Sequence, residues 1–119
     1  MRTIVETALF VKSADALMGD KYLTELIVEL AANPRAGDLI EKTGGFRKIR
    51  GKRVGSGKRG GVRVYYFPCH SLERPIYMIA CLAKADDKPF SAKQKKALKD
   101  LAQEFKAANV VQFAGERRS

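Results

Sequence analysis

The segment from Thr43 to Phe67 reads TGGFRKIRGKRVGSGKRGGVRVYYF, and this pattern predicts a β-hairpin. Residues 46–50 and 62–68 carry β-branched and aromatic side chains between charged ones, as expected of strands. Residues 51–61 between them are rich in glycine, which readily adopts the backbone conformations of a turn. We therefore expect the two strands to pair as neighbours in an antiparallel sheet.

The alternation of side chains assigns the residues of the first strand to faces. Successive side chains of a strand point to opposite sides of the sheet. Phe46, Lys48 and Arg50 are therefore expected on one side, with Arg47 and Ile49 on the other.

The same hairpin carries most of the net charge of the protein. Residues 43–63 contain eight Lys and Arg, seven of the ten glycines and no acid. The chain has a formal net charge of +10, so eight of the ten net positive charges lie in this segment. Charge concentrated in this way attracts phosphate, with a steep dependence on salt. The alternative is a solvated hairpin whose charges only keep the protein soluble.

The rest of the chain predicts a single α+β domain over residues 1–108, followed by a flexible tail over 109–119. The periodicity of apolar residues, helix-capping residues and breaks at Gly and Pro define its elements. They are a strand at 3–9, helices at 12–18 and 20–33, the hairpin, a buried strand at 76–83, and a helix that begins at Ser91. Ser91 and Gln94 form a capping-box pattern, and the lysines of this helix lie opposite its apolar stripe.

Composition limits the class of protein further. The chain has 119 residues, enough for one domain that buries about two thirds of its unfolded surface. No apolar run is long enough to cross a bilayer, and the first residues lack the features of a signal peptide. We therefore expect a cytoplasmic protein that does not bind membranes. Cys69 and Cys81 fit neither a CxxC motif nor a zinc site and are expected to be buried and reduced.

The basic hairpin has the residue types needed to cleave RNA without a metal ion or cofactor. If the strands pair in a suitable register, Arg63 joins Lys48 and Arg50 across the ladder. Lys48 is the candidate general base or acid, because neighbouring cations favour its neutral form. Arg50 and Arg63 would stabilise the charge of the phosphorane transition state. The basic residues expected to bind the RNA backbone are Arg47, Lys52, Arg53, Lys58 and Arg59.

Other candidate residues are weaker. Gly57-Lys58 lacks the spacing and the hydroxyl of a nucleotide-binding P-loop. His70 is the only histidine, which excludes a ribonuclease mechanism that uses two. Asp86 and Asp87 are adjacent acids that solvation explains better than a magnesium site does. Lys84 follows the buried strand and either joins the basic cluster or marks where burial ends.

The order of elements and several motifs resemble the RelE/HigB-type toxins of bacterial toxin–antitoxin systems. The similarity covers nearly the whole chain. Its most specific parts are the hairpin TGGFRKIRGKRVGSGKRGGVRVYYF, the segment PIYMIACLAKADD and the final helix FSAKQKKALKDLAQEF. The resemblance implies a small RelE-like fold, with an N-terminal strand, two helices, an antiparallel sheet and a C-terminal helix.

The resemblance also implies an activity and partners. Proteins of this family cleave mRNA on the ribosome and are neutralised by a cognate antitoxin, here expected to be a helix-turn-helix protein that alone contacts DNA. The positions that match the family's catalytic residues are Lys48, Arg50, Arg63 and Lys84. Some members carry a tyrosine or histidine before the last helix, whereas Lys88-Pro89-Phe90-Ser91 offers an aromatic ring without a titratable group. The proton donor and acceptor therefore stay open.

Two other interpretations share these electrostatic features. A non-catalytic RNA- or ribosome-binding module would display the same cations, because charges that position RNA resemble charges that act in catalysis. An inactive relative, retained for repression or for binding its antitoxin, is the third interpretation.

Overall fold

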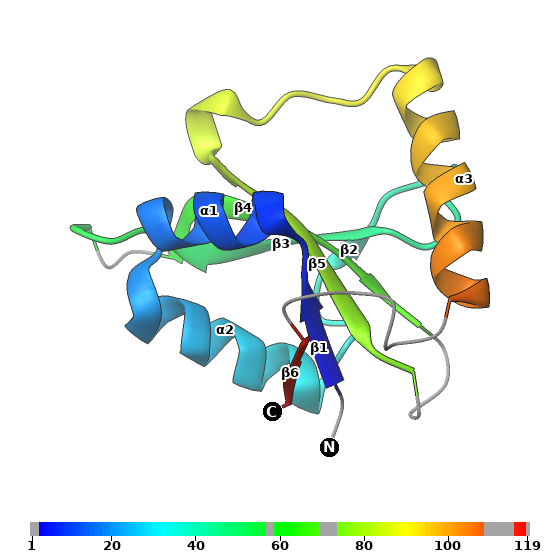
Figure 1. Ribbon diagram of the computed structural model, residues 1–119. Coiled ribbons are helices and arrows are strands. Elements are labelled where there is room, and N and C mark those ends of the chain that lie inside the picture. Colours follow the sequence, from blue (N-terminus) through cyan, green and yellow to red (C-terminus); the bar gives the residue numbers. More distant parts are fainter. Residues whose placement is uncertain (1–2, 57–58, 70–73, 109–115, 119) are drawn as a thin grey trace.

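The computed structural model describes residues 3–56, 59–69, 74–108 and 116–118, and it confirms the expected α+β fold (Figure 1). The helices are α1 (Ala8–Leu17), α2 (Gly19–Ala32), a short 3-10 helix η1 (Lys84–Asp86) and α3 (Ala92–Ala107). The strands are β1 (Thr3–Glu6), β2 (Asp38–Leu39), β3 (Arg47–Lys52), β4 (Arg59–Pro68), β5 (Ile76–Ala83) and β6 (Glu116–Arg118).

The strands form one sheet in the order β2-β3-β4-β5-β1-β6. Its neighbours are antiparallel except β1 and β5, which run parallel. Strand β5 therefore lies between β4 and β1, the interior position that its nearly continuous apolar sequence predicts. The expected hairpin is β3 and β4, which pair antiparallel with a register shift next to Gly51.

Helices cover both faces of the sheet, and each face has its own core (Figure 1). On one face α1 and α2 pack Phe10, Leu26 and Leu30 against the sheet. On the other face Phe105 of α3 stacks on Tyr77, with ring centroids 4.1 Å apart. The apolar stripes of the helices therefore decide which side of each strand is buried.

Some boundaries differ from those expected. The first strand ends at Glu6, because the Thr7 hydroxyl accepts a hydrogen bond from the Phe10 amide and caps α1 there. The glycine-rich loop is shorter, because pairing continues to Lys52 and Arg59. Strand β2 was not expected. Residues 109–115 lie outside the described part, and 116–118 form β6 beside β1 where a flexible tail was expected.

A glycine allows α3 to approach the loop between β2 and β3. Gly44 has φ +77°, and a Cβ placed on it would lie 3.0 Å from the Ala102 Cβ and 3.6 Å from the Lys99 Cα. The Gln94 side chain and the Ser91 hydroxyl complete the predicted capping box at the start of α3. The close approach at Gly44 thus sets where α3 lies against this loop, and the capping box sets where the helix begins.

Among the described residues, no helix combines the length and the apolar character needed to cross a membrane.

The stacked pair on the α3 face predicts a stability effect. Phe105→Ala should lower the free energy of unfolding by about 3–5 kcal/mol, because it leaves a cavity beside Tyr77. Glu104→Ala, at an exposed position one residue away, should change it by less than about 0.5 kcal/mol. Urea denaturation of both variants tests this, and equal losses would contradict it.

Candidate functional site

A cavity of about 480 Å³ opens on the hairpin, and basic side chains line it. Lys48 and Arg50 come from β3, Arg63 comes from β4, and Asp87 follows η1. Residues 36–38 also line it and add a second carboxylate, Asp38, which pairs with Lys48 in the sheet. Three of the expected catalytic cations therefore share one cavity.

The register of the two strands brings these cations together. Arg50 pairs directly with Arg63, and Lys48 pairs with Tyr65. Side chains at paired positions point to the same face, with Cβ atoms roughly 4.5–5.5 Å apart. The expected alternation is confirmed as well, because Ile49 packs in the core with α1 and α2, whereas Phe46 packs in the core with α3.

An internal ion pair joins the cluster. Lys48 Nζ lies 3.1 Å from Asp87 Oδ2, and the two side chains are 38% and 11% exposed. The Tyr65 hydroxyl donates a hydrogen bond to Asp87 Oδ1, and Lys48 Nζ lies 5.8 Å from the centre of the Tyr65 ring. The expectation that solvation accounts for Asp87 is therefore wrong, because η1 turns the chain so that this carboxylate faces β3 and β4.

Tyr65 is neutral in this arrangement. Burial raises the pKa of its hydroxyl, and the hydrogen bond to Asp87 raises it further. A neutral phenol holds the carboxylate in place but does not accept a proton at physiological pH. Tyr65 therefore positions Asp87 and does not act as a base.

The two arginines of the cavity differ in how firmly they are held. The Arg63 Nη1 donates to the Gly60 carbonyl at 2.6 Å and to the Val62 carbonyl at 3.2 Å, so the hairpin orients its guanidinium. Arg50 is exposed. Within the part of the chain that the structure describes, neither arginine forms an ion pair.

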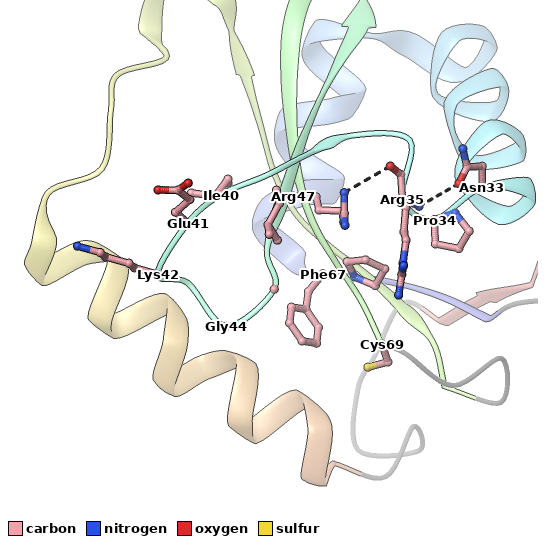
Figure 2. Close-up of a pocket in the computed structure, with 13 residues that line it drawn as sticks. Asn33, Pro34, Arg35, Ile40, Glu41, Lys42, Gly44, Arg47, Phe67 and Cys69 are labelled. Atoms are coloured by element: carbon pink, nitrogen blue, oxygen red, sulfur yellow. Dashed lines mark hydrogen bonds between the residues drawn. The ribbon is translucent and has the colours of Figure 1, made fainter.

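Arg47 points away from this cavity. Its Nη1 donates to the Gly37 carbonyl at 2.7 Å and to the Arg35 carbonyl at 3.4 Å. Figure 2 shows it in a second cavity, of about 600 Å³, between the loops around Arg35 and Gly44. Arg47 therefore holds the segment that forms a wall of the first cavity, rather than lying on the surface expected for RNA.

Tyr66 also holds the segment around Gly37, through its hydroxyl group. Its hydroxyl donates to the Pro34 carbonyl at 2.8 Å and accepts from the Gly37 amide at 2.9 Å. A Cβ at Gly37 would lie 2.7 Å from the Lys48 carbonyl oxygen, so only glycine fits this close approach.

The other expected site residues are dispersed. Lys52 Nζ lies 3.7 Å from Glu25 Oε2 on α2, and Arg53 is exposed. Lys84 is exposed in η1 and does not line the cavity. Lys58 and the side chain of Arg59 lie outside the described residues, as does His70. The structure thus brings together Lys48, Arg50 and Arg63 but not the remaining cations.

Sequence reasoning missed Asp87 and the role of Tyr65. The alternation of β4 already puts Tyr65 on the face of Arg63, which is a usable signal. Asp87 gives no such signal in the sequence. Its partners Lys48 and Tyr65 lie 39 and 22 positions earlier in the chain, and the contacts depend on the path of η1.

No protein-family model matches this chain. The described residues contain no group of three or more His, Cys, Asp or Glu side chains placed to hold a metal ion.

The trio predicts different effects for two substitutions of Asp87. Asp87→Ala removes the acceptor of the buried Tyr65 hydroxyl and should lower the free energy of unfolding by about 1–3 kcal/mol. Asp87→Asn keeps an acceptor and should cost less than about 1 kcal/mol, because solvent screens the half-exposed Lys48 ammonium. Urea denaturation measures both, with the exposed Asp86→Ala as control. Equal losses for the two variants would show that charge outweighs the hydrogen bond.

Proposed function

We propose that this protein is a ribosome-dependent mRNA endoribonuclease, the toxin component of a type II toxin–antitoxin system. The observation that carries the proposal is the cavity in which Lys48, Arg50 and Arg63, from two adjacent strands, lie together. Two carboxylates, Asp38 and Asp87, also line this cavity, so the three cations leave a net positive charge there. Such a cavity can surround a single phosphodiester with positive charge. The resemblance of the hairpin and the final helix to RelE/HigB-type toxins supports the same assignment.

The proposed reaction uses the 2′-hydroxyl of the RNA as nucleophile. The 2′-oxygen forms a bond to phosphorus, and the bond from phosphorus to the 5′-oxygen breaks. This leaves a 2′,3′-cyclic phosphate and a 5′-hydroxyl end. One proton must leave the 2′-hydroxyl and one must reach the departing 5′-oxygen. The protein supplies both transfers and stabilises the charge between them.

In the proposed reaction, Arg50 and Arg63 stabilise the negative charge of the phosphorane transition state. A guanidinium stays charged at any working pH and matches two phosphate oxygens with parallel hydrogen bonds. The Arg63 hydrogen bonds to Gly60 and Val62 hold this group in place before the substrate arrives, so little reorganisation is needed.

The sequence left open whether Lys48 is the general acid or the general base, and the ion pair with Asp87 supports the role of acid. Lys48 in contact with Asp87 is an ammonium, which donates a proton and does not accept one. In the proposal Lys48 therefore protonates the leaving oxygen, and Asp87 accepts the proton of the 2′-hydroxyl. Lys84 contacts RNA outside the cavity, where its exposure leaves it accessible.

Partners follow from the same charge distribution. A ribosome offers the polyanionic surface on which a small domain with a net charge of +10 docks, and mRNA in that setting is the substrate. A helix-turn-helix antitoxin would neutralise the toxin and would alone contact DNA. The proposed location is the cytoplasm, where ribosomes and mRNA are.

A second candidate function is a non-catalytic RNA- or ribosome-binding module. The contacts of Asp87 favour it, because both carboxylate oxygens already accept hydrogen bonds, one from Lys48 and one from the Tyr65 hydroxyl, before any RNA binds. Such a module would bind ribosomes with a steep salt dependence and leave mRNA intact.

Cleavage of mRNA by purified protein and ribosomes, mapped by primer extension, separates the two functions. Arg63→Ala and Lys48→Ala should each lower the cleavage rate at least about 100-fold, because the first removes a charge that stabilises the phosphorane and the second removes the proton donor. Lys12→Ala removes one charge from an exposed position on α1 and is the matched control.

Folded Arg63→Ala or Lys48→Ala protein with full activity would overturn the catalytic assignment. Wild-type protein that binds ribosomes but cleaves no message would instead support the binding module.

A further inference from the structure

Three cavities follow one another from the hairpin to α3. The cationic cavity described above shares Lys48 with a cavity of about 180 Å³, which Tyr65, Phe90 and Lys95 also line. That cavity in turn shares Phe90 and Lys95 with one of about 660 Å³ on α3. Because adjacent cavities share lining residues, they lie next to one another, and together they mark a path from β3 and β4 to α3.

This path is basic beyond the hairpin. The middle cavity adds Lys88 to Lys48 and Lys95, and no acid lines it. The lining of the cavity on α3 includes Lys42, Lys95, Lys96 and Lys99 together with one acid, Asp100. Asp100 lies 3.5 Å from Lys96, so its charge is balanced within the helix and the other lysines stay available.

An aromatic ring lies at the junction of the cavities. The Phe90 ring meets the Tyr65 ring edge-on, with centroids 5.2 Å apart, and is only partly buried. Tyr65 is itself held by its hydrogen bond to Asp87, so the Phe90 ring has a fixed support. A supported, partly exposed ring among lysines is the arrangement on which nucleic-acid bases stack.

The position of α3 gives the lysines a regular spacing. Lys95 and Lys99 are four residues apart, which corresponds to roughly 6 Å along a helix. Lys99 also packs next to Gly44, where the close approach of the loop holds α3 near Lys42. The lysines therefore form a row on a rigid element rather than on a flexible loop.

We propose that single-stranded RNA leaves the cationic cavity over Phe90 and continues along α3. One base stacks on Phe90, and phosphates of the following nucleotides contact Lys95 and Lys99. This inference rests on the proposed function and extends it to the neighbouring nucleotides. RNA is favoured over an acidic protein because the path begins at the proposed site of phosphodiester cleavage and contains a stacking ring.

Binding of a short 2′-O-methyl oligouridine tests the proposal without cleavage, since its nucleophile is blocked. Lys95→Gln combined with Lys99→Gln should weaken binding and reduce the salt slope by about 1.4, at about 0.7 per phosphate contact on a single strand. Lys93→Gln combined with Lys106→Gln removes the same charge from exposed positions of α3 outside both cavities. This control should leave the slope nearly unchanged.

The stacking contact has its own measurement. Phe90→Leu keeps an apolar side chain beside Tyr65 but loses the ring, and binding should weaken about 5- to 150-fold with an unchanged salt slope. Circular dichroism and thermal unfolding of each variant establish that it is folded.

Several outcomes would overturn the path along α3. Equal losses in the Lys95/Lys99 variant and its control would show a non-specific charge effect. Unchanged RNA binding with weaker binding of polyglutamate would mark the surface as one for acidic proteins. If the wild-type protein cleaves mRNA as proposed and the Lys95/Lys99 and Phe90 variants bind RNA as well as it does, the result would overturn the path along α3 and leave the proposed activity standing. If these variants lose RNA binding and the control does not, but the wild-type protein cleaves no mRNA, the result would support the path and contradict the proposed activity.

Discussion

The pairing of β3 with β4 is the constraint on which the site depends. Its register puts Arg50 opposite Arg63 and Lys48 opposite Tyr65 on one face. Like charges at paired positions destabilise a hairpin, so other interactions must hold this arrangement. The two cores supply them, because Ile49 and Val64 are buried under α1 and α2 while Phe46 and Phe67 are buried near α3. The repulsion is thereby kept at a surface where a phosphate would relieve it.

Polar contacts give the cavity its walls. Arg47 and Tyr66 hold the segment around Gly37 from the α1/α2 side, and Asp87 joins Lys48 and Tyr65 on the other side. The Arg47 contact spans ten residues and the others span 22 to 39, so the cavity exists only in the folded chain. A cationic cluster supported in this way reorganises little when a ligand binds, which is what electrostatic catalysis requires.

One carboxylate changes the interpretation of the cluster. From the sequence alone, Lys48 was a candidate for either general base or general acid. Paired with Asp87, the same side chain is a donor, and the carboxylate becomes the acceptor in the proposed reaction. The same trio also fixes Tyr65 beneath Phe90, which links the cavity to the basic surface of α3. Chemistry and RNA positioning would therefore both depend on the two partly buried contacts of Asp87.

The sequence alone determined the α+β class, the hairpin, the alternation of its side chains and the capping box at Ser91. These features follow from local periodicity and backbone preferences, which act within a few residues. It also located the cluster of Lys48, Arg50 and Arg63, because strand pairing needs only a short turn. Tertiary structure alone decided the partner of Lys48, the inward role of Arg47, strand β2 and the pairing of β6. The partner of Lys48 and the pairing of β6 depend on where a distant segment returns to the sheet. Arg47 and β2 depend on how the chain turns between residues 37 and 47, and no local pattern specifies either path.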